Sequence, residues 1–178
     1  IVVALLLVGA CGVLLVRGLI AAADPSLPVD DAYISFSYAR TLAAGGGLRL
    51  GPEAEPVEGF SNPFWVATLS LAGWLGLPIP MTAVLLSLLA AVATAIALFA
   101  TARLFVEGPW LPLLAAWAFA LAPGVGFFIA SGLETVVAGL TLLLAFRFLV
   151  SAPSGAMDGR AAVALLAFAL LRPEGVLV

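Results

Sequence analysis

Two adjacent carboxylates, Asp30 and Asp31, open the segment of this sequence that is richest in chemistry. They begin the run DDAYISFSYAR at residues 30–40, directly after a first apolar stretch and shortly before a cluster of glycines. One such carboxylate is typical of a helix N-cap. A pair at the mouth of an apolar helix could instead supply a general base, or oxygen ligands for a divalent cation such as Mg²⁺, Mn²⁺ or Ca²⁺ beside a phosphate.

Ionisable side chains also occur at or inside the ends of later apolar runs, where they are costly unless they are paired or functional. Glu134 lies in the segment SGLET (residues 131–135), and Arg172 and Glu174 lie in LRPEG (residues 171–175). Glu134 could simply stabilise the first turn of a helix, and Arg172 could pair with Glu174 or extend its charge to the interface. The functional alternative is phosphate binding, because an arginine offers a planar fork of donors.

The composition excludes several classes of protein. Of the 178 residues 64% are hydrophobic and 10% are charged, and the mean hydropathy is +1.24, whereas a soluble domain is about 45–50% apolar and about 25% charged. The net charge of -3 comes with no basic stripe, so we expect no nucleic-acid partner. The 178 residues include no histidine and one cysteine. Within them this excludes the usual His/Cys zinc sites, a Ser-His-Asp or Cys-His catalytic system and an intrachain disulfide.

The apolar runs predict a polytopic membrane protein. A helix that crosses the hydrocarbon core needs about 20 apolar residues. The run at 63–77 falls short of this length, so we expect it to dip into the membrane and return, or to lie along the interface. A signal peptide is an alternative for the first run, which we interpret as a retained helix. The expected spans are residues 1–23, 81–106, 110–130, 133–150 and the run that starts at 161.

The arginine positions favour one topology. Arg103, Arg147 and Arg160 lie near the ends of the expected spans, and short cytoplasmic loops of membrane proteins carry an excess of arginine and lysine. If residues 63–77 do not cross the membrane, all three arginines lie in the cytoplasm. The acidic stretch 24–62 and both later polar segments then share the outer face of the plasma membrane.

Within the expected outer loop, residues 30–42 predict a short interfacial helix. Ile34, Tyr38 and Leu42 recur at i, i+4 and i+8, which indicates a stripe that faces the membrane. The glycines at 45–47 should end this helix.

Three glutamates follow in a proline-rich part of the same loop. Glu53 and Glu55 fit a solvated loop. Glu58 differs from them because the segment GFSNP (residues 59–63) leads from it directly into the short apolar run. A role for Glu58 at a site is therefore as strong an interpretation as a solvated loop.

In combination these motifs resemble a known family. The segments DDAYISF and YAR (residues 30–40), VEGFSNP with the following Trp65, SGLET and LRPEG are similar to signatures of membrane-embedded glycosyltransferases of the GT-C superfamily, closest to the actinobacterial arabinofuranosyltransferase-like proteins. The likeness touches both ends of the sequence. It implies an all-α, polytopic transmembrane helical bundle whose first outer loop, about 24–62, carries short juxtamembrane helices. Residues 1–178 would form the N-terminal part of this module.

The resemblance also implies a reaction. The donor would be a polyprenyl-phosphate-linked sugar, either arabinofuranose or a hexose, and the acceptor a cell-wall or surface glycan at the outer face of the bilayer. The acidic pair would supply the catalytic base, Asp30 first and Asp31 second. The expected substrate-binding residues are Tyr33, Arg40, Glu58, Asn62, Glu134, Arg172 and Glu174.

The expected mechanism is a single inverting displacement. Asp30 would take the proton of the acceptor while Arg172 or Arg40 stabilises the departing phosphate, with a divalent cation on Asp31 and Glu134 as an option. A transporter or flippase of lipid-linked sugars is the alternative function, for which charged groups should lie at the bilayer midplane on broken helices. A structural membrane module without turnover is a third reading of the same sequence.

Overall fold

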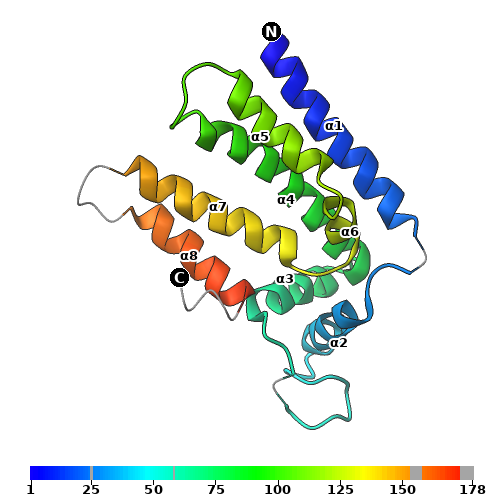
Figure 1. The fold of residues 1–178 in the computed structure, drawn as a ribbon. Helices are drawn as coiled ribbons and strands as arrows, with labels where there is room; N and C mark the ends of the chain where they lie inside the picture. The colour runs from blue at the N-terminus through cyan, green and yellow to red at the C-terminus, as the bar shows by residue number, and fades with distance from the viewer. Residues whose placement is uncertain (25, 58, 153–157, 173–178) are drawn as a thin grey trace.

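The computed structural model describes residues 1–24, 26–57, 59–152 and 158–172. All regular secondary structure in these ranges is helical, which confirms the all-α class (Figure 1). The eight helices are α1 (Val2–Ala22), α2 (Asp30–Ala43), α3 (Pro63–Trp74), α4 (Ile79–Ala102), α5 (Trp110–Leu121), α6 (Val125–Ala130), α7 (Thr135–Ser151) and α8 (Gly159–Leu171).

Two of these helices, α1 and α4, are long and apolar enough to cross a membrane. They have 21 and 24 residues, and about 20 residues at 1.5 Å per residue match the hydrocarbon core of a bilayer. The apolar helices α5, α7 and α8 are shorter, with 12, 17 and 13 residues. Helix α3 has 12 residues, which agrees with the short apolar run predicted at 63–77.

Helix α4 lies at the centre of the bundle and packs against α1, α5, α6 and α7. Small side chains let helix backbones approach closely in apolar surroundings. The buried contacts here are accordingly rich in alanine, with Ala10, Ala90, Ala91, Ala95, Ala116 and Ala120 all at most 6% exposed.

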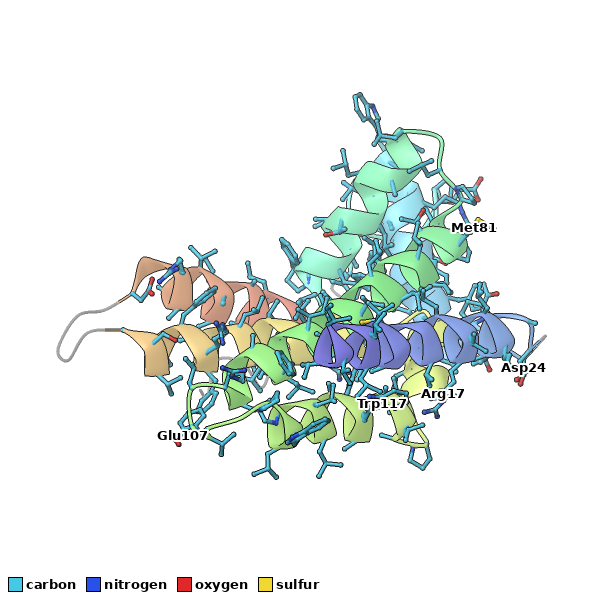
Figure 2. All side chains as sticks on the ribbon, turned by 90° about the horizontal axis from the view of Figure 1, so that it is seen from above. Arg17, Asp24, Met81, Glu107 and Trp117 are labelled. Atoms are coloured by element: carbon cyan, nitrogen blue, oxygen red, sulfur yellow. The ribbon has the colours of Figure 1, made fainter. Side chains whose placement is uncertain are left out.

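Helices α2 and α3 pack against each other across one end of this bundle, where α1 ends and α7 begins (Figure 1). Their shared core includes Phe36 and Trp65, and Leu171 from the end of α8 packs into the same cluster. The connection between α4 and α5, the end of α7 and the beginning of α8 lie at the other end (Figure 1). Figure 2 likewise shows Glu107, between α4 and α5, far from Asp24 at the end of α1.

The predicted helix at 110–130 is wrong as a single span. The structure breaks it into α5 and α6, with Ala122 in an extended conformation between them. The cause is Pro123, which disfavours the helical conformation at the residue before it and has no N–H to donate. The carbonyl groups at this break accept hydrogen bonds from the side chain of Arg17 in α1. Arg17 donates to the oxygens of Ala120, Ala122 and Pro123 at 2.6, 2.9 and 3.0 Å.

The predicted membrane-facing stripe of α2 is wrong in part. Ile34 is 40% exposed, but Tyr38 is 2% exposed. The hydroxyl of Tyr38 donates to the carbonyl oxygen of Val57 at 2.6 Å, and its ring packs on Phe60 with a centroid separation of 4.8 Å. The loop after α2 therefore folds back over Tyr38, a long-range contact that the helical period does not show.

Candidate functional site

The polar segments of the sequence meet in one pocket of about 270 Å³ at the end of the bundle where α2 and α3 lie. It is formed by the first half of α2, the loop before α3, the residues before α7 and the end of α8. We call it the polar pocket. Its lining residues are Asp31, Ile34, Ser35, Gly59, Phe60, Ser61, Asn62, Leu133, Glu134 and Arg172.

An ion pair at the base of α7 forms one wall of the polar pocket. The Nε atom of Arg172 lies 3.0 Å from Oε1 of Glu134, whose side chain is 6% exposed. The Nη2 atom of Arg172 donates to Oγ1 of Thr135 at 2.6 Å. Among the described residues, these bonds use two of the five N–H donors of the guanidinium. The side chain of Arg172 is 34% exposed.

A buried amide connects this ion pair to α2. The Nδ2 atom of Asn62 donates to Oε2 of Glu134 at 2.7 Å and to Oγ of Ser35 at 3.1 Å. Asn62 and Ser35 are 7% and 4% exposed. A buried polar group without a partner is costly, and this network satisfies the carboxylate on both oxygens. It therefore fixes α2, α7, α8 and the loop before α3 relative to one another.

The turn of residues 131–133 holds the start of α7 against α2. Ser131 accepts from the N–H of Val29 at 3.0 Å, and the carbonyl of Gly132 accepts from Nε1 of Trp65 at 3.2 Å. Gly132 has φ of +81°, and a Cβ placed on it would lie 2.7 Å from the ring of Phe36. Only glycine fits both the backbone conformation and the space.

The two aspartates differ in position. Val29, not Asp30 or Asp31, is the N-cap of α2, so the predicted carboxylate cap is wrong. Both aspartates lie in the first helical turn, where the helix dipole favours negative charge. Both side chains are exposed, but Asp31 lines the polar pocket and Asp30 does not. The geometry therefore favours Asp31 over Asp30 as a group that acts in this pocket.

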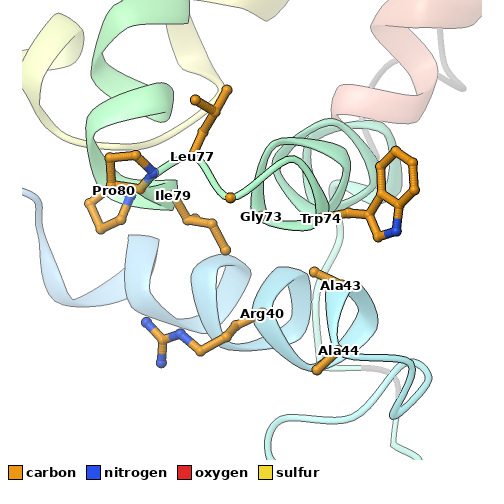
Figure 3. A pocket seen from close by; sticks show the side chains of 10 residues that line it. Arg40, Ala43, Ala44, Gly73, Trp74, Leu77, Ile79 and Pro80 are labelled. Atoms are coloured by element: carbon orange, nitrogen blue, oxygen red, sulfur yellow. The ribbon is translucent and has the colours of Figure 1, made fainter.

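Two further candidates lie outside the polar pocket. Tyr33 is 47% exposed, with its ring edge-to-face on Phe36 at 5.3 Å. Arg40 lines a separate cleft between the ends of α2 and α3 and the start of α4 (Figure 3). Arg40 follows Asp31 by nine positions in α2, which corresponds to a rise of about 13.5 Å along the helix axis. The structure thus places Arg172, and not Arg40, beside the aspartate.

Glu58 and Glu174 lie outside the described residues. The alternative in which Arg172 pairs with Glu174 is therefore not tested, and among the described residues Arg172 pairs with Glu134.

A metal site at Asp31 and Glu134 stays a prediction. Within residues 1–24, 26–57, 59–152 and 158–172, no group of three or more Asp, Glu or Cys side chains is placed to hold a metal ion. Both oxygens of Glu134 are already bonded to Arg172 and Asn62. The reaction proposed below has no step through a divalent cation.

Sequence reasoning missed two members of the network, Ser35 and Thr135. Ser35 lies four residues after Asp31, and such residues share one face of a helix. That spacing could have indicated from the sequence that Ser35 lies on the same face of α2 as Asp31. No comparable pattern marks Thr135, because its partner Arg172 is 37 residues away.

Comparison of the chain with protein-family models, curated proteins and solved structures finds no match. The functional argument therefore depends on the residues of the pocket.

Proposed function

We propose that this chain is part of an integral membrane glycosyltransferase that moves a sugar from a polyprenyl-phosphate donor to a glycan acceptor at the outer surface of the plasma membrane. The observation that carries the proposal is the meeting of four separate segments in the polar pocket. Asp31, Asn62, Glu134 and Arg172 are spread over most of the sequence but line one cavity. These segments are the ones that resemble the signatures of GT-C enzymes.

The chemistry needed is within reach of this set of side chains. In the proposed reaction a hydroxyl oxygen of the acceptor attacks the anomeric carbon of the donor sugar. The bond from that carbon to the phosphate oxygen breaks, and the polyprenyl phosphate leaves with the bonding electrons. Asp31 accepts the hydroxyl proton, which is general-base catalysis by a positioned carboxylate. The sugar configuration inverts because there is a single displacement.

Arg172 stabilises the leaving phosphate in this proposal. Three of its N–H donors form no bond to a described residue, and such donors suit phosphate oxygens because charge-assisted bonds to phosphate are strong. Glu134 and Asn62 act as positioning residues, because Glu134 binds the guanidinium and Asn62 binds the second oxygen of Glu134. The pocket thus divides into a base on α2 and a phosphate-binding arginine at the end of α8.

The proposed topology places the polar pocket outside. Helices α1, α4, α5 with α6, α7 and α8 would cross, while α2 and α3 lie at the outer interface. Arg103, Arg147 and Arg160 then lie on the cytoplasmic side, in keeping with the positive-inside rule. Short α5 and α8 are compatible with this arrangement only if the bilayer thins or neighbouring residues extend the apolar length.

The test is sugar transfer by the chain reconstituted in lipid. Donors carrying arabinofuranose or a hexose on polyprenyl phosphate are supplied with an acceptor glycan, and released polyprenyl phosphate is measured. Arg172→Ala should raise the apparent KM for the donor by about 10- to 150-fold, the equivalent of one charge-assisted bond. Arg172→Lys should recover part of the loss because it keeps the charge but not the fork. Arg160→Ala, at the other end of α8, is the control.

The same experiment separates the proposal from lipid transport. A transporter or flippase would move the labelled donor between leaflets without releasing polyprenyl phosphate. Movement without release, or equal effects of Arg172→Ala and Arg160→Ala, would contradict the transferase proposal.

A further inference from the structure

A second cleft, of about 600 Å³, lies beyond the far end of α2 from the polar pocket. Its walls come from the end of α2, the end of α3 and the beginning of α4 (Figure 3). We call it the Arg40 cleft. Residues that line it include Arg40, Ala43, Gly73, Trp74, Leu77 and Pro80.

The charge of this cleft has one sign. Arg40 is the one charged residue among the described residues that line it, and its side chain is exposed. Neither ion pair formed by the described residues includes it. An exposed guanidinium without a carboxylate in the same cleft favours an anionic ligand, and phosphate matches the arginine fork.

The rim of the cleft is apolar and unusually exposed. Trp74 is 71% exposed, Leu75 60%, Leu77 50% and Met81 70%. These side chains follow one another from the end of α3 into the first turn of α4. A continuous apolar surface of this kind marks contact with a partner or a membrane, and tryptophan concentrates where hydrocarbon meets lipid headgroups.

We propose that the Arg40 cleft binds the headgroup phosphate of an anionic phospholipid from the surrounding membrane. Arg40 contacts the phosphate, and Trp74, Leu77 and Met81 lie against the glycerol and the upper acyl chains. The site is distinct from the polar pocket, where the donor phosphate is proposed to bind. The proposal rests on the membrane location in the proposed function but not on sugar transfer. Its role is to hold the pair α2 and α3 at the membrane surface, next to the polar pocket that these helices help to form.

Native mass spectrometry of the chain with equal amounts of phosphatidylglycerol and phosphatidylcholine of matched acyl chains tests the proposal. The wild type should retain phosphatidylglycerol in preference. Arg40→Gln should lower the ratio of bound phosphatidylglycerol to phosphatidylcholine about five-fold, the effect of one basic residue at an anionic membrane surface. Arg49→Gln is the matched control, because Arg49 lies in the following loop and donates instead to the carbonyl of Ala54. Its ratio should equal that of the wild type.

Two further arms make the result decisive. Trp74→Ala should weaken retention of both lipids while helix content, measured by circular dichroism, stays unchanged. Added decaprenyl phosphate should leave the phosphatidylglycerol in place. Equal ratios for the wild type and Arg40→Gln would overturn the proposal, and so would displacement by decaprenyl phosphate, which would make the cleft a donor site. Lipid binding is measured without any sugar transfer, so failure of the transferase proposal would not change this outcome.

Discussion

The two ends of α8 carry the same chemical pair in different surroundings. At its beginning, Asp158 lies 2.7 Å from Arg160, and their side chains are 14% and 68% exposed. At its end, Arg172 lies 3.0 Å from Glu134, and the side chains are less exposed, with 34% for the arginine and 6% for the glutamate. Water and salt screen the first pair, so it adds little to stability. The second pair is removed from water, so each charge depends on the presence of the other.

The two ion pairs also differ in their hydrogen-bond partners, because one pair is more buried than the other. Among the described residues, the carboxylate of Asp158 accepts from the backbone and side chain of Arg160. Glu134 needs the amide of Asn62 on its second oxygen, and Arg172 also donates to Thr135. Burial therefore requires additional partners, and these partners come from distant parts of the chain. The comparison shows that the buried ion pair joins α8 to distant parts of the chain, whereas the exposed pair joins neighbours in sequence, with the guanidinium of Arg160 over the ring of Phe148 in α7.

The largest expected difference between the polar-pocket end of the bundle and the opposite end of α8 is in the rate of sugar transfer. Asp31→Asn keeps the size of the side chain but removes the proton acceptor, so sugar transfer should fall by about 10²- to 10⁴-fold. Asp30→Asn should lose much less, because Asp30 does not line the polar pocket. Asp158→Asn makes the same chemical change at the other end and should leave the rate unchanged. The measurement is the rate of polyprenyl phosphate release at saturating donor, beside thermal unfolding of each variant. A greater loss for Asp30→Asn would move the base to that residue.

The next difference is in stability. Glu134→Ala leaves the charge of Arg172 in a partly buried position and removes the acceptor of Asn62. The cost should be about 3 kcal/mol, the lower end for a broken buried pair, because Arg172 is still in partial contact with solvent. Denaturant unfolding in detergent gives the value. Asp158→Ala should change the midpoint far less, and equal shifts for the two variants would remove the distinction between the ends.

Local patterns in the sequence predicted much of the fold. The apolar lengths of α1 and α4, the shortness of α3 and the end of α2 before its glycines follow from composition and spacing. The break between α5 and α6 could have been read from Pro123, since proline restricts the residue before it. The burial of Tyr38 could not, because it depends on Val57 and Phe60 in a loop that folds back.

The candidate site was predictable as a set of residue types but not as a network. Glu134 and Arg172 are conspicuous because charge is costly in apolar runs. Their pairing joins the beginning of α7 to the end of α8, a contact between distant segments that no local pattern indicates. Asp31 was distinguished from Asp30 only by the helical rotation of about 100° between neighbours, which decides the face on which each lies.

A glycine at the polar-pocket end should be less replaceable than one further along α7. Gly132→Ala forces a side chain into the left-handed region and against Phe36, so it should cost about 2 kcal/mol or more. Gly139→Ala is the control, because a Cβ on Gly139 meets nothing within 4 Å. In a helix that change should stabilise by about 0.5–1 kcal/mol. Unfolding midpoints of both variants check the prediction, and a neutral Gly132→Ala would mean that the turn at 131–133 relaxes easily.

The smallest expected effect is at the exposed end of α8 and depends on pH. The side chain and backbone N–H groups of Arg160 lower the pKa of Asp158 below its ordinary value. A carboxyl with a depressed pKa in the folded state binds a proton more readily when unfolded, so its stabilising contribution is complete above the unfolded pKa, about 3.9. The contribution is lost as the pH falls through the lower folded value. The contrast variant is Asp158→Asn, which keeps an oxygen for the helix cap but cannot titrate.

The measurement is the difference in unfolding temperature between the wild type and this variant from pH 7 to pH 2.5. This difference should be constant above about pH 5 and become smaller in acid. It should also become smaller in high salt, because the arginine of the pair is exposed. A difference that stays the same in acid and in salt would show that Asp158 acts as a helix cap alone, and the two ends of α8 would then no longer be comparable as ion pairs.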